Sequence, residues 1–400
     1  MHDAAASRRP APVLLALGYL AFVSLGLPDA VPGVAWPSVR DAFDLPQAAL
    51  GAAIAAGAVA SFLSGMVAGR LVDRLGIGAL LAASTALAAL GVAGFAAAPA
   101  FVVFLLAATI VGFGSGAVDA GLNAYAAHHF PARHMTWLHA AYSVGAAIGP
   151  ALMTAVLARG ASWRAGYAVI AATLALLAAA YTAARHRWAA DAPRDAAVAE
   201  AAAPPPLAGG ASALLRRPRL WLQLALFVVY AGLEVVAGQW SYTVLVEARG
   251  ATAETAGALV TLYWSSLLAG RVLLGFVVER IGPVRLLRLG TLGAVCGAAL
   301  VALPTAPLAV AAAGLATLGF SIAPIFPALM GETPRRIGRD VATHAVGFQI
   351  SSATLGVALL PAVAGVLGQR LGLDAIPIFV VVCALLFLAL HETLVAVADR

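Results

Sequence analysis

Three carboxyl groups lie inside long apolar stretches of this chain: Asp29, Asp119 and Glu234. At such depth in lipid, a carboxylate that is neither paired nor hydrated is costly, by roughly 2.5–3.5 kcal/mol on insertion scales. Desolvation favours the neutral acid, so these groups are suited to gaining and losing a proton. We expect all three to carry protons, and Asp29 and Glu234 also to bind a polar ligand.

Asp119 and Asp29 each have a distinctive local sequence. Asn123 follows Asp119 by four residues, so the two side chains share one helix face. Asp119 is the strongest candidate for a proton carrier and Asn123 for a ligand contact, although a neutral acid could also bond helices together. Asp29 stands between Pro28 and Pro32, which predict a bend whose freed carbonyls line a cavity, unless the group is hydrated at the membrane interface.

Glu234 is surrounded by residues that suit a sugar. Tyr230 precedes it by one turn, and Gln239 and Trp240 follow. Carboxylates and amides bond hydroxyl groups, while an aromatic ring covers the apolar face of a pyranose. Trp240 fits equally well an aromatic belt at the membrane interface.

Further polar residues recur at similar depth. His139 and Tyr142 share a helix face, and Tyr142 and Gln349 stand at equivalent positions 207 residues apart, as a shared central cavity would require. We include these three among the ligand-binding candidates. Arg271 either extends to the interface or neutralises a cavity acid.

The elements that must position these residues are membrane helices. The chain has 400 residues, of which 62% are hydrophobic and 10% charged, and its mean hydropathy of +0.95 excludes an ordinary soluble globule. Apolar stretches of about 20 residues are long enough to cross a bilayer. They predict an all-α membrane protein with twelve spans: 12–36, 47–69, 78–98, 101–127, 136–158, 163–184, 219–243, 254–278, 284–304, 307–330, 341–367 and 373–396.

A repeated motif divides these spans into two halves. Gly-x-x-x-acid-Arg-x-Gly appears after the second span and again after the eighth. A charged, then Pro- and Gly-rich stretch separates the halves, typical of a flexible linker. We therefore expect a six-helix bundle over 1–185, a linker over 186–218 and a second bundle over 219–400. The motif residues, which we expect to act in gating, are Gly69, Asp73, Arg74, Gly76, Gly275, Glu279, Arg280 and Gly282.

Arginine distribution predicts the orientation. If both termini are cytoplasmic, eighteen arginines lie on the inner side and five on the outer side. We expect a multi-pass protein of the bacterial inner membrane, with no cleavable signal peptide. Arginines facing anionic lipid explain the net charge of +6 without a nucleic-acid partner. The two cysteines fall in separate spans, so neither a disulfide nor a metal site is expected.

The motif resembles the signature of the major facilitator superfamily, although Gly78 and Ala79 replace its trailing basic pair. Asp29, the Asp119–Asn123 pair and the segment from Leu138 to Ala146 are similar to the fucose permease branch of sugar–proton symporters. That branch has glutamate where Asp119 stands and an amide where Tyr142 stands. The resemblance implies two pseudo-symmetric six-helix bundles around a central site. It also implies that Asp73 latches onto the start of span 11, where a helix N-terminus favours an anion.

These expectations combine into a secondary transporter. We expect proton-coupled symport of a small polar solute, and a sugar is the solute class that we expect. Sodium is the other possible coupling ion. Proton-coupled efflux of an amphiphilic, drug-like compound is the alternative. A membrane sensor fits less well, since no soluble output module is visible, and no nucleophile–base pair indicates an enzyme. No cofactor is expected; the expected partners are solute, proton and lipid bilayer, and the expected state is a monomer.

Overall fold

The computed structural model describes residues 12–130, 132–188, 214–338 and 341–398. These residues form helices without strands, and twelve of the helical segments are long and apolar enough to span a membrane, as predicted. The six spans of the first half comprise α1 (Pro12–Asp29) with α2 (Val31–Phe43), α3 (Ala49–Leu75), α4 (Ile77–Ala97), α5 (Phe101–His129), α6 (Ala132–Ala158) and α7 (Trp163–Ala184).

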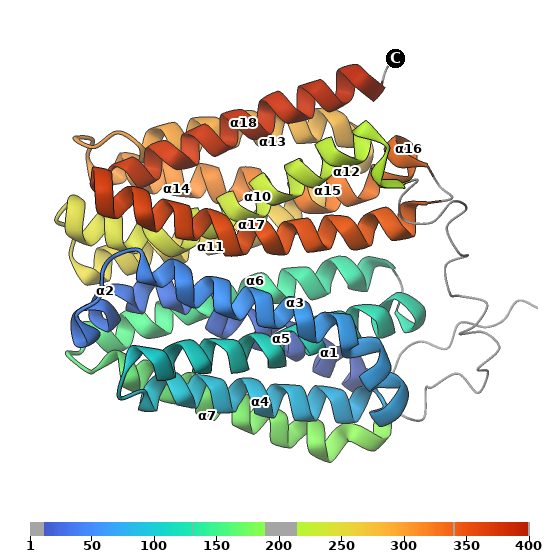
Figure 1. Ribbon diagram of the computed structural model, residues 1–400, viewed down its shortest axis with the longest axis horizontal. Helices are drawn as coiled ribbons and strands as arrows, with labels where there is room; N and C mark the ends of the chain where they lie inside the picture. The colour runs from blue at the N-terminus through green and yellow to red at the C-terminus, as the bar shows by residue number, and fades with distance from the viewer. Residues whose placement is uncertain (1–11, 131, 189–213, 339–340, 399–400) are drawn as a thin grey trace, which may run out of the picture.

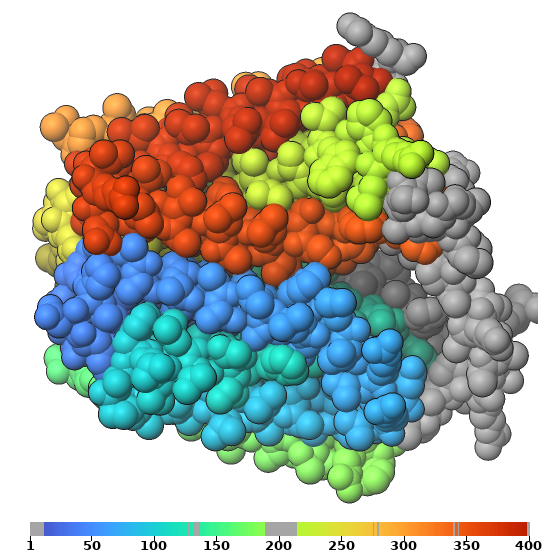
Figure 2. Space-filling view, in the orientation of Figure 1, coloured from blue at the N-terminus to red at the C-terminus, as the bar shows by residue number. Residues whose placement is uncertain are grey.

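The second half repeats the pattern. Its helices are α10 (Pro218–Thr243), α11 (Ala253–Gly275) with the short α12 (Val278–Ile281), α13 (Pro283–Val301), α14 (Leu308–Ile322) with α15 (Ile325–Gly331) and α16 (Thr333–Ile337), α17 (Ala342–Leu371) and α18 (Ala375–Ala398). Figure 1 shows the two sets as two layers of roughly parallel helices, and Figure 2 shows them meeting along one seam. Most of the predicted linker, 189–213, lies outside the described residues.

Two helices break where proline interrupts the backbone ladder. The first span divides into α1 and α2 at Ala30, between Pro28 and Pro32, which confirms the predicted bend. The break leaves the carbonyl oxygen of Asp29 free to accept a hydrogen bond from Gln239 Nε2 at 2.7 Å. The tenth span breaks in the same way beside Pro324, between α14 and α15.

Glycine allows the helices to approach closely at equivalent places in the two halves. A Cβ atom on Gly145 would overlap the Val23 carbonyl oxygen, and one on Gly356 would overlap that of Val228. α6 therefore packs on α1 much as α17 packs on α10. The motif glycines Gly76 and Gly282 both adopt positive φ, 76° and 81°, so both copies of the motif form the same turn.

The two halves contact each other mainly at one end of the molecule, here called the paired end, where α2 ends and α3 begins. α3 lies against α17, and α6 against α11. Close approaches there join Gly51 to Ala362 and Gly257 to Thr154. Toward the opposite, arginine-rich end, α3 and α17 diverge (Figure 1), and Gly69 and Gly347 have no described atom near their Cβ positions.

Candidate functional site

A cavity of about 420 Å³ lies between the halves, midway along the helices. Both halves line it: α1, α2, α3, α4, α5 and α6 on one side, and α10, α11, α15 and α17 on the other. All three predicted carboxylates, Asp29, Asp119 and Glu234, belong to its wall. The helices are apolar around this depth, so these few polar groups determine what the cavity can bind.

The first half contributes two carboxylates that are open to the cavity. Asp29, the last residue of α1, accepts a hydrogen bond from the Tyr142 hydroxyl at 3.1 Å. Asp119 in α5 accepts one from Asn123 Nδ2 at 2.9 Å. Both side chains are exposed although they lie deep in the bundle, so water reaches them through the cavity. Within the described part of the chain, neither is paired with a cation.

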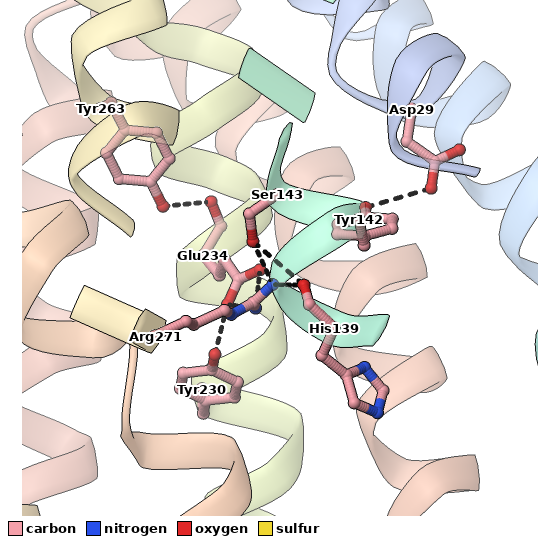
Figure 3. A network of polar contacts seen from close by, with 8 residues as sticks. All are labelled: Asp29, His139, Tyr142, Ser143, Tyr230, Glu234, Tyr263 and Arg271. Carbon is pink, nitrogen blue, oxygen red and sulfur yellow. Dashed lines mark hydrogen bonds and ion pairs between the residues drawn. The ribbon is translucent and has the colours of Figure 1, made fainter. Parts of the chain in front are cut away.

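The second half contributes a carboxylate that is paired. Glu234 in α10 forms an ion pair with Arg271 in α11, with Oε1 3.3 Å from Nη2. The Tyr230 hydroxyl also donates to Glu234, and the Tyr263 hydroxyl donates to its backbone carbonyl at 2.8 Å. Figure 3 shows Arg271 at the centre of this network. Charge-assisted hydrogen bonds of this kind hold both partners in a fixed geometry.

Two polar links cross from one half to the other at the level of the cavity. Arg271 Nη1 donates to Ser143 Oγ in α6 at 2.7 Å and to the His139 carbonyl at 3.5 Å. Gln239 Nε2 donates to the Asp29 carbonyl. The cavity wall is therefore also part of the contact between the halves.

The structure brings most of the predicted ligand-binding residues together. His139, Tyr142, Tyr230 and Gln239 line the same cavity as the carboxylates. Asn123 lies beside it, where it holds Asp119 without belonging to the cavity wall.

Two predicted ligand residues lie elsewhere. Trp240 is fully buried in the second half, and its indole Nε1 donates to the Pro361 carbonyl at 3.1 Å. It therefore belongs neither to the cavity wall nor to an aromatic belt. Gln349 is buried against α16, where its Nε2 bonds Thr333 Oγ1 at 2.9 Å. Each residue lies on a helix that lines the cavity but faces away from the cavity wall.

Several cavity residues were not predicted as ligand contacts. Trp264, Phe326 and Arg271 line the cavity, and Ser143 anchors Arg271. Arg271 does not extend to the interface; it neutralises a cavity acid, the other reading that its sequence position allowed. The sequence feature that could have identified Arg271 as a cavity residue is a guanidinium deep in an apolar span. No sequence feature identified Trp264 and Phe326 as cavity residues, since aromatic residues occur throughout such helices.

The paired end is closed by side chains from both halves. Arg40 in α2 bonds Glu247 at 2.8 Å, and Gln47 Nε2 bonds the same carboxylate oxygen at 2.8 Å. Glu247 lies in a π-helical turn, Val244–Ala248, that follows α10. Gln47 is itself fixed by Trp36, whose indole donates to it at 3.0 Å. These contacts close the cavity toward the paired end.

Comparison with known proteins gives the family. The profile of the Major Facilitator Superfamily matches residues 18–349, most of the chain. This chain belongs to the major facilitator superfamily.

One curated relative of this superfamily member aligns over part of the chain. Residues aligned over 183 positions are 25% identical to Bypass of stop codon protein 6 of Saccharomyces cerevisiae, a match that covers 44% of this chain and 37% of the yeast protein. The chain thus spans well under half the length of that relative.

Two solved structures share the fold over nearly their whole length. The nucleoside transporter NupG (D323A mutant) superposes with a TM-score of 0.76 at 13% identity, covering 94% of this chain and 98% of that chain. A bacterial homologue of the human lysosomal transporter Spinster, inward-facing and occupied, gives a TM-score of 0.73 at 15% identity and covers 96% of each chain.

The predicted gating motif of this superfamily member lies at the arginine-rich end of α3. Asp73 and Arg74 are exposed, and within the described residues no hydrogen bond or ion pair joins Asp73 to the start of α17. Among the described side chains the expected contact with span 11 is therefore not seen, and α3 and α17 diverge at this end (Figure 1). In the second copy Arg280 is exposed, while the side chain of Glu279 lies outside the described residues.

Proposed function

We propose that this transporter couples proton movement to the import of a small polar solute, a sugar, by alternating access. One observation carries the proposal: Asp29 and Asp119 face a cavity shared by both halves, and neither is paired with a cation in the described chain. Protonation would remove two negative charges from a confined space between the bundles. Such a change alters the electrostatic cost of closing the cavity, as coupling to protons requires.

The opposite wall supports a sugar as the solute. Glu234 and Gln239 offer acceptors and donors for hydroxyl groups, and the rings of Trp264 and Phe326 offer apolar faces. The resemblance of Asp29 and the Asp119–Asn123 pair to the fucose permease branch supports the same class. A thermal-shift screen of sugars, nucleosides, amino acids and organic acids at two pH values would identify the solute.

The side of the membrane to which the cavity is closed follows if the arginine-rich end is cytoplasmic. Positive charge favours that side of the membrane, and we place both termini there, in a bacterial inner membrane. The cavity is then closed to the outside by the Arg40–Glu247 contact. The protein is in an inward-facing state, from which solute would be released into the cytoplasm.

Replacing Asp119 by asparagine tests the proton role. The amide keeps the shape and the hydrogen bond but cannot ionise, so pH-driven accumulation in reconstituted vesicles should fall at least roughly tenfold while solute exchange persists. The matched control is Asp374→Asn, an exposed acid away from the cavity, which should transport normally. Undiminished pH-driven accumulation by Asp119→Asn would end the proposal.

A second candidate function, export of an amphiphilic cation, rests on the apolar wall that α3 and α5 provide. Ala53, Ile54, Ala108 and Val111 face the cavity beside the unpaired carboxylates. A hydrophobic cation would satisfy both surfaces and would compete with protons. Stabilisation against thermal unfolding by hydrophobic cations, and not by sugars, would favour this function.

A further inference from the structure

The Arg271 guanidinium is the charged group of the cavity wall that contacts both halves within the described chain. Its Nη2 atom lies 3.3 and 3.5 Å from the carboxylate oxygens of Glu234. Its Nη1 atom donates to Ser143 across the boundary at 2.7 Å. The side chains of Arg271 and Glu234 are only 14% and 12% exposed. Figure 3 shows the guanidinium between Glu234 on one side and α6 on the other.

We infer that Arg271 is a positioning residue that joins Glu234 to the contact between the halves, and that Glu234 keeps its charge during transport and binds solute rather than the coupled proton. The inference deepens the proposed function and rests on it. It replaces the sequence-based expectation that all three cavity acids carry protons.

The surroundings of the three acids support this division of roles. Glu234 accepts bonds from a guanidinium and from the Tyr230 hydroxyl, so its negative charge is balanced where it stands. Protonating it would leave the Arg271 charge unbalanced in a poorly hydrated site, which is strongly unfavourable. Asp29 and Asp119 each accept a hydrogen bond from one neutral donor, so no cation among the described residues opposes their protonation.

The groups around Glu234 that can carry charge or titrate come from several elements. Tyr230 on its own helix and Arg271 and Tyr263 on α11 bond it. His139 and Tyr142 on α6 and Asp29 on α1 line the same cavity. Arg271 is the permanent cation of this set. Its removal should therefore leave the Glu234 carboxylate without a permanent counter-ion among these groups.

The link also suggests how solute binding loosens the halves. Arg271 Nη1 uses Ser143 and the His139 carbonyl as acceptors. A solute hydroxyl that accepts from Nη1 and donates to Glu234 would take the place of Ser143. α11 would then be released from α6 at the cavity, which the bundles need before they can rock.

Label distances across the paired end test this inference without solute or gradient. Spin labels at Ala42→Cys and Arg370→Cys, both exposed, report whether that end is closed. The parent carries Cys296→Ala and Cys383→Ala, and the protein is in lipid nanodiscs over a pH series. Ser143→Ala should raise the open-to-closed ratio roughly tenfold, since a bond to a charged group is lost, with an unchanged pH profile.

The variants at the ion pair provide the decisive comparison. Arg271→Gln should add a pH-dependent transition that Arg271→Gln/Glu234→Gln lacks, whereas Arg271→Lys, which keeps the charge, should follow the parental profile. Identical profiles for Arg271→Gln and the double variant would overturn the inference. An open-to-closed ratio in Ser143→Ala equal to that of the parent would also overturn the inference.

Glu234→Gln alone keeps the inference testable if Arg271→Gln does not fold. Its pH profile should match that of the parent, because the proton sites are elsewhere; a flattened profile would assign the proton to Glu234. Failure of the proposed function would appear separately, as absence of proton-driven accumulation in vesicles of the unmodified protein.

Discussion

At the scale of residues, the same functional group has different surroundings within one cavity because its neighbours differ. Asp29 and Asp119 are open to the cavity with one neutral donor each, whereas Glu234 is paired with Arg271. Depth in the membrane identified all three as candidates. Only the partners distinguish a carboxylate with a neutral donor from one that is paired with a cation.

The hydrogen bond from Tyr142 to Asp29 is expected to strengthen solute binding. Tyr142→Phe removes the hydroxyl that donates to this carboxylate at 3.1 Å. The apparent affinity for solute in vesicle uptake should weaken roughly threefold to tenfold, the usual consequence of losing one hydrogen bond.

Tyr181→Phe is the matched control for this substitution. Its hydroxyl donates to the Leu17 carbonyl at 3.3 Å, buried and outside the cavity wall. That variant should lower the free energy of unfolding by about 1 kcal/mol and leave affinity unchanged. Equal losses of affinity in both variants would contradict a specific role for Tyr142.

At the scale of elements, broken helices and glycine contacts place the polar groups. The break between α1 and α2 puts Asp29 at a helix end, and Gln239 of the other half bonds its free carbonyl. The contact of α3 with α17 depends on Gly51, whose Cβ would overlap Ala362 Cα. Small residues of this kind set how far the bundles can close.

Gly51→Ala should therefore open the paired end. The added methyl group meets backbone that cannot move aside, so the population closed at that end should decrease severalfold, measured by spin-label distances between Ala42→Cys and Arg370→Cys. Gly69→Ala lies on the same helix with no described atom within 4 Å, and should leave the distances unchanged. A shift of similar size in both variants would show that helix propensity, rather than the contact, is responsible.

At the scale of the whole molecule, the two bundles meet at the paired end and diverge at the other. The paired end is held by backbone contacts and by the polar cluster of Arg40, Gln47 and Glu247. The side chains of Arg40 and Glu247 are 21% and 23% exposed, so their attraction is modest and screened by salt.

Glu247→Gln should make the cavity accessible from the paired end. A cysteine at Thr354, which lines the cavity, should react severalfold faster with a membrane-impermeant thiol reagent added on that side. Raising the salt concentration should have the same effect on the parent. The control is Arg159→Gln, at the same end but bonded within its own helix, which should leave the reaction rate unchanged. A faster reaction in that variant would show a nonspecific effect of charge.

The sequence by itself determined the twelve spans and the bend in the first span. It also predicted a division into two halves and singled out three acids, which line one cavity. Each depends on local features: the length of apolar runs, the position of proline, the repeat of a motif and the cost of a charge in lipid. Such features act within a few residues of the chain, so they can be read without knowing the contacts.

Only the tertiary structure decided which faces of the helices meet. It paired Arg271 with Glu234, placed Trp240 and Gln349 away from the cavity wall, and left Asp73 without a partner among the described residues at the start of α17. The physical reason is that a membrane helix is apolar toward lipid and toward its neighbours alike, so its sequence hardly records its rotation about its own axis. The closed end, likewise, depends on contacts between residues roughly 200 positions apart.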